Sequence, residues 1–175
     1  MDVLGRAEPL LLKLDRVAGG RQAGIVISGE MRDHPRTRRA FTAITWLLVA
    51  EFAIGLAAVV VAIVLTTNGD DIGWPVWMRT LVVLGMTATL FYFAWRARLG
   101  HYWAYSRLRL FSKIFPVITL VLAAVPGLYP MWMVTEQIVF SLILIGVSDY
   151  LESEHMRSAF PKPPRPARGI VRSPM

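Results

Sequence analysis

The feature that most constrains the fold of this chain is an apolar run over residues 41–65, in which Glu51 is the only ionisable side chain. As an α-helix, a run of 25 residues would be about 37 Å long. That length is enough to cross a hydrocarbon layer of about 30 Å with some tilt. The polar stretch at residues 66–71 contains Asn68 and Gly69, which are typical helix-stop residues. The run therefore predicts a membrane-spanning helix.

Further apolar runs of similar length follow. Arg79 and Arg96 lie near the two ends of the second run, where long side chains can extend to the headgroups. Pro116 is expected to kink the third run, and the Pro- and Gly-containing stretch at 126–130 predicts a tight turn into the fourth. We therefore predict an all-α, polytopic membrane domain at residues 41–150, with spans at 41–65, 76–97, 110–126 and 131–150.

The basic residues predict the orientation of these spans. The chain has 19 Lys and Arg residues against 12 Asp and Glu, a net charge of +7. Eighteen of the basic residues lie in the N-terminal segment 1–40, around the link between the second and third runs, or in the tail 151–175. Because Lys and Arg accumulate in cytoplasmic segments, we expect a multi-pass protein of the bacterial plasma membrane with both termini in the cytoplasm.

Composition argues against most kinds of chemistry. The chain has no cysteine, which excludes a disulfide scaffold, a thiolate zinc site and an iron–sulfur cluster. Asp149, Glu152, Glu154 and His155 are grouped at the inner end of the fourth span, but no second cluster would complete a metal site. The sequence also contains no phosphate-binding glycine loop, nucleophile elbow or zinc-helix motif. We expect no metal, no cofactor and no enzymatic activity.

Glu51 is the most informative single residue, because a carboxylate near the bilayer centre costs roughly 2.5–3.5 kcal/mol on insertion. Helical spacing places it on one face with small residues, and such faces are where membrane helices approach closely. We expect it at a helix interface, bonded to a polar group of matching depth. It is then either a packing hydrogen bond or a proton or cation site. The shared face comprises Gly55, Ala58 and Ala62, and the expected partners are Thr87, Thr119 and Ser141.

Arg79 and Glu136 form a second candidate constellation. Both lie a few residues from the outer ends of the second and fourth spans, at comparable depth. Since charged groups inside a membrane usually find partners, we predict an interhelical ion pair.

Residues 95–109 interleave aromatic side chains with arginines. Such interleaving can mark nucleic-acid binding, but between two spans it is better explained by Trp and Tyr at the headgroup level and Arg on anionic lipid. We expect no nucleic acid, and contact with anionic lipids or a cytoplasmic partner through Arg96, Arg98, Trp103, Arg107, Arg109 and Lys113.

The C-terminal tail is rich in proline and basic residues. Such a segment is expected to be extended and to have no core of its own. We expect one of two roles for it. The tail contacts anionic lipid, or it docks on a partner through Pro161, Pro163, Pro164, Arg165, Pro166 and Arg168.

The sequence LLVAEFAIG at residues 47–55 is similar to the first-helix pattern of the small multidrug resistance transporters. These are four-helix proteins that exchange protons for cationic drugs. This resemblance implies a small proton-coupled transporter with Glu51 as the coupling residue. The short loops of that family differ from the long basic segments of this chain.

A second resemblance concerns the layout of the whole chain. RTRRAF at residues 36–41 leads into the first span, and a basic Pro-rich tail follows the fourth. With the bias towards arginine, this layout resembles small accessory membrane proteins of actinobacteria, in particular the lipid uptake coordinator class of Mce-type lipid importers. The resemblance implies a partner, the permease of a multi-subunit complex, and no activity of its own. We therefore predict a non-catalytic accessory subunit, with the proton-coupled transporter as the alternative.

Overall fold

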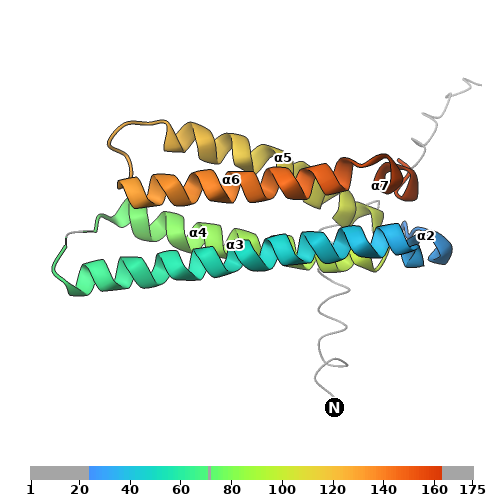
Figure 1. The fold of residues 1–175 in the computed structure, drawn as a ribbon, viewed down its shortest axis with the longest axis horizontal. Helices are drawn as coiled ribbons and strands as arrows, with labels where there is room; N and C mark the ends of the chain where they lie inside the picture. The colour runs from blue at the N-terminus through green and yellow to red at the C-terminus, as the bar shows by residue number, and fades with distance from the viewer. Residues whose placement is uncertain (1–23, 71, 163–175) are drawn as a thin grey trace, which may run out of the picture.

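The structure is a computed structural model that describes residues 24–70 and 72–162. In this part of the chain all regular elements are helices, and four long ones form an antiparallel bundle (Figure 1). The neighbouring pairs are α3 with α4, α4 with α5, α5 with α6, and α6 with α3, so the bundle closes on itself. The four helices are α3 (Pro35–Thr67), α4 (Trp74–Arg98), α5 (Tyr102–Ala123) and α6 (Met131–Glu152).

The two ends of the bundle differ in character (Figure 1). The loop end carries the loops 68–73 and 124–130. The cap end carries the short helices α2 (Gly29–Asp33) and α7 (Glu154–Ala159) together with the turn 99–101.

The longest helix begins and ends at residues whose chemistry favours those positions. The ring nitrogen Nδ1 of His34 accepts the backbone N–H of Arg36 at 3.2 Å, and Pro35 occupies the first helical position, where its missing N–H costs nothing. At the other end Gly69 has a φ of 91°, which glycine adopts without strain. This end lies within the predicted stop at residues 66–71. The helix starts at Pro35, before the predicted start of the span at residue 41.

Three helices, α3, α4 and α6, are long and apolar enough to cross a membrane. Each carries apolar side chains that are more than half exposed, such as Val60, Leu81 and Leu142. A helix bundle whose outer surface is apolar all round suits a lipid environment. The structure therefore supports a membrane protein with three spanning helices.

The predicted third span, 110–126, is not among these three helices. It coincides with the second part of α5, which ends at Ala123 and continues through Pro116 as one helix. Every 18-residue stretch of α5 contains Arg107, Arg109 and Lys113. These charges make α5 as a whole less apolar than its neighbours.

The segment 95–109, expected to link the second and third spans, is largely helical, because α4 and α5 are joined by the three residues 99–101 alone. Gly100 has a φ of 95°, and a Cβ there would lie 3.1 Å from Val26 Cγ1. Ile27 N–H donates to Gly100 O at 3.0 Å, and Tyr102 N–H donates to Ile25 O at 3.1 Å. The turn therefore holds the chain that precedes α2 against the bundle.

This tight turn places part of the predicted contact surface inside the protein. Trp103 is 1% exposed and Arg96 is 8% exposed, because the first turn of α5 and the last turn of α4 pack against each other. The prediction that these two residues contact lipid headgroups or a partner is therefore wrong. The other four predicted contact residues remain at least partly accessible: Arg98, Arg107, Arg109 and Lys113.

The predicted tail, 151–175, also begins later than expected. Residues 151–160 form the end of α6 and the helix α7, and Phe160 is buried against Tyr105 with ring centroids 4.3 Å apart. Pro161 is exposed. The remaining predicted docking residues lie outside the described residues: Pro163, Pro164, Arg165, Pro166 and Arg168.

Candidate functional site

A row of polar side chains runs through the interior of the bundle, and Glu51 is its most costly member. Glu51 is 2% exposed, and one carboxyl oxygen lies 3.0 Å from the hydroxyl of Thr87 on α4. The small residues Gly55, Ala58 and Ala62 lie on the same buried face of α3. Of the three partners expected from depth, the structure thus brings Thr87 to Glu51, while Ser141 and Thr119 are buried elsewhere in the core.

The hydrogen bonds that the Thr87 hydroxyl can make depend on whether Glu51 is protonated. The Thr87 hydroxyl lies 3.0 Å from Glu51 Oε1 and 3.0 Å from the carbonyl oxygen of Val83. A hydroxyl has one proton to donate. If that proton goes to Val83, the Thr87 oxygen accepts from a protonated Glu51, and both contacts are satisfied. The second carboxyl oxygen, Oε2, is buried without a hydrogen-bond partner among the described residues.

Gln137 on α6 is a buried residue that the sequence analysis did not single out. Its side chain is fully buried, and neither amide atom has a hydrogen-bond partner within the described part of the chain. Leu47 on α3 lies against Gly146 on α6. Because the two helices are antiparallel, Glu51, four residues after Leu47, is level with the residue four before Gly146. Gln137 is five residues further along α6, about 8 Å along the axis from that level. The sequence pattern that could have identified Gln137 is a single amide side chain in an apolar run, one helical turn from Ser141.

Arg79 and Glu136 form the ion pair that their depth predicts. Their side chains are hydrogen-bonded to each other, and each is 9% exposed. They connect α4 and α6, which are diagonal in the bundle, so the pair crosses its interior near the loop end. The Arg79 guanidinium also lies over the ring of Tyr129, 5.8 Å from the centroid.

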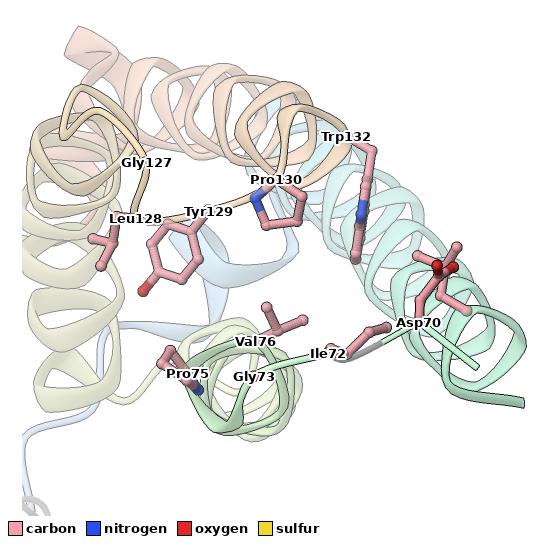
Figure 2. A pocket seen from close by; sticks show the side chains of 11 residues that line it. Asp70, Ile72, Gly73, Pro75, Val76, Gly127, Leu128, Tyr129, Pro130 and Trp132 are labelled. Carbon is pink, nitrogen blue, oxygen red and sulfur yellow. The ribbon is translucent and has the colours of Figure 1, made fainter. Parts of the chain in front are cut away.

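A pocket of about 470 Å³ opens at the loop end, above this ion pair. Figure 2 shows residues of the two loops facing each other across it, with Tyr129 and Pro130 on one side and Ile72 to Val76 on the other. Trp132 at the start of α6 closes the side next to Asp70. The lining is mostly apolar, with aromatic rings of the kind found at the headgroup level.

Glu152, one of the acidic residues grouped at the end of α6, takes part in ion pairs. Glu152 accepts a hydrogen bond from Arg109 at 2.8 Å and is also paired with Lys113. Within residues 24–70 and 72–162 no group of three His, Cys, Asp or Glu side chains is placed to hold a metal ion. The carboxylate of Glu152 instead ties α6 to α5.

A pair of histidines joins the start of α3 to α7 at the cap end. The rings of His34 and His155 are 4.6 Å apart, and His155 Nε2 lies 2.9 Å from the Thr37 hydroxyl. Because that hydroxyl donates to Met31 O at 2.9 Å, His155 is the donor. Burial, and then the nearby charges of His34 and Arg36, lower the pKa of His155. The lowered pKa favours the neutral ring, which acts here as a structural hydrogen-bond donor.

The comparisons with known proteins add no family to this description. No protein-family model matches the chain, and neither a curated protein nor a solved structure matches it.

Proposed function

We propose that this chain is a non-catalytic accessory subunit of a larger plasma-membrane complex, with its helix surfaces and its cap end as contact surfaces. The observation that supports this proposal best is the cap end itself. Three segments distant in sequence fold together there beyond the apolar part of the bundle: residues 24–33, 99–105 and 154–160. A helix bundle needs no such folded cap to cross a membrane, so the cap is an additional surface that a partner can bind.

The proposal includes four spans, with the cap end in the cytoplasm. The 22 residues of α5 are about 33 Å long, and Val117 and Val121 in its second half are each 62% exposed. Its basic residues Arg109 and Lys113 lie towards the cap end, where both pair with Glu152. The accumulation of Lys and Arg at this end favours the cytoplasmic side.

Because the chain contains no cysteine, single cysteines can test this topology directly. In intact cells a membrane-impermeant maleimide is expected to label Asp70→Cys and Val125→Cys, which lie in the two loops. Ser158→Cys in α7 should react only after lysis, and the unmodified chain provides the background. Labelling of Ser158→Cys in intact cells would refute the orientation, and protection of Val125→Cys would refute a membrane span at α5.

The layout that resembles the lipid uptake coordinator class suggests which partner to look for, the permease of an Mce-type lipid importer. Affinity purification of the tagged chain in a gentle detergent, followed by mass spectrometry, is expected to recover a permease in stoichiometric amount. Recovery of the tagged chain alone, as a monomer or dimer, would overturn the proposal.

A small proton-coupled transporter remains the second candidate, and one observation favours it. Glu51 Oε2 and the Gln137 amide are buried without partners among the described residues, so these polar groups are available to bind a proton or a cation inside the bundle. Glu51→Gln separates the two functions, because glutamine can keep the hydrogen bond to Thr87 but cannot carry a proton. The accessory function predicts unchanged co-purification of the permease, whereas the transporter predicts that proton-coupled export or drug resistance is abolished.

A further inference from the structure

A second pocket, of about 580 Å³, lies at the cap end between α2, the start of α3 and the end of α4. These three elements meet at one end of the bundle (Figure 1). Its polar lining residues are Arg32, Arg38 and Arg98, together with Asp33. Its apolar lining residues are Phe41, Trp95 and Leu99. The lining of the pocket therefore combines cationic groups with aromatic and aliphatic ones.

The charges in this pocket are not balanced. Arg32 is hydrogen-bonded to Asp33 at 3.2 Å, and this contact holds the pKa of Asp33 below its usual range, so the two charges offset each other. Within the described part of the chain, the exposed guanidinium groups of Arg38 and Arg98 have no carboxylate paired with them. Two arginines from different helices thus face a shared space with a net charge of +2, an arrangement suited to a phosphate group.

The position of the pocket along the bundle indicates where that phosphate comes from. Phe41 begins the first apolar run, and Trp95 lies at the end of the second. Trp95 is 45% exposed, as is usual for tryptophan at the boundary between hydrocarbon and headgroups. The arginines therefore lie at the level of the lipid phosphates.

A path for an acyl chain continues from the pocket along α4. Ala88, Tyr92, Trp95 and Leu99 follow one another at spacings of four, three and four residues, so they share one face of the helix. The rings of Tyr92 and Trp95 are 6.3 Å apart. A shallow hollow of about 400 Å³ lies at Ala88 and Tyr92, in the apolar part of the bundle. An apolar track thus connects the cationic pocket with the membrane interior.

We propose that this pocket is a binding site for an anionic phospholipid, whose phosphate is held by Arg38 and Arg98 and whose acyl chain follows the track on α4. The site does not depend on the accessory function, since all of its residues belong to this chain. It would hold the bundle at a fixed depth in the leaflet on the side of the cap end.

The test is native mass spectrometry of the full chain in detergent, titrated with phosphatidylglycerol or phosphatidylcholine. The wild-type chain is expected to retain one phosphatidylglycerol in preference to phosphatidylcholine. The double variant R38Q/R98Q should weaken this binding about tenfold or more. The matched control R36Q/R39Q removes the same charge from exposed positions outside the pocket and should change the affinity less than about twofold.

A second variant tests the other half of the site without altering charge. Ala88→Trp fills the hollow on α4 and is expected to weaken retention of long-chain phosphatidylglycerol. Equal losses in R38Q/R98Q and R36Q/R39Q would show diffuse electrostatic attraction and overturn the proposal, as would equal binding of phosphatidylcholine. Displacement of the lipid by millimolar inorganic phosphate would assign the pocket to a soluble phosphate and also overturn it.

Discussion

Replacing Arg79 by leucine is expected to lower the free energy of unfolding by about 3–5 kcal/mol. The variant leaves the carboxylate of Glu136, which is 9% exposed, buried without its counter-charge. The cost of an uncompensated buried charge exceeds the net contribution of the intact pair, because both charges were already removed from solvent. Denaturant-induced unfolding of the purified chain in micelles, followed by circular dichroism, measures the difference.

Two controls make this prediction specific. In Arg79→Leu/Glu136→Leu no charge is left unpaired, and the double variant should recover most of the lost stability. Arg109→Leu breaks a pair whose side chains are 36% and 34% exposed, and it should cost less than about 1 kcal/mol. If Arg79→Leu were no more destabilising than Arg109→Leu, the diagonal pair would not hold α4 and α6 together.

Replacing Trp103, which is 1% exposed, is also expected to lower the free energy of unfolding strongly. Its ring lies edge-on to Phe93 at 5.9 Å and near Tyr92 at 6.3 Å. Trp103→Ala removes this packing and leaves a cavity, with an expected loss of about 3–5 kcal/mol. Unfolding in micelles, followed by far-ultraviolet circular dichroism, gives the value.

Trp95 and a conservative change at Trp103 provide the comparison. Trp95→Ala, at a position 45% exposed, should change stability by less than about 0.5 kcal/mol. Trp103→Phe keeps an aromatic ring and loses no hydrogen bond in the described structure, because Nε1 has no partner there. It should cost less than Trp103→Ala. A small effect of Trp103→Ala would mean that the cap end repacks and that its fold is not fixed by this ring.

The parts of the fold that sequence could predict are those set by local apolar pattern. The runs at 41–65, 76–97 and 131–150 lie within α3, α4 and α6. The periodicity of α3 correctly grouped Glu51 with Gly55 on a buried face. Matching depth also paired Arg79 with Glu136 and included Thr87 among the partners of Glu51. Each of these inferences needs only a helical repeat and the thickness of a membrane.

The remaining features depend on contacts between distant segments. The turn at Gly100 is stabilised by Ile25 and Ile27, which the local sequence of the turn does not reveal. That turn determines that Trp103 faces inwards although its neighbours are typical of a headgroup belt. In the same way, Arg38 and Arg98 are 60 residues apart, and only the packing of α3 against α4 brings them to one pocket.

The length of α3 has a consequence for any molecule that approaches the protein from the cap end. Its 33 residues form one unbroken helix, about 50 Å long. Even a helix inclined by 40° to the bilayer normal would extend about 38 Å along that normal, which exceeds the hydrocarbon thickness of about 30 Å. At any inclination up to 40°, some part of this helix therefore lies outside the hydrocarbon. With Arg36 and Arg39 in its first two turns, α3 holds charged side chains at a fixed distance from the apolar part of the bundle, where an approaching molecule can meet them.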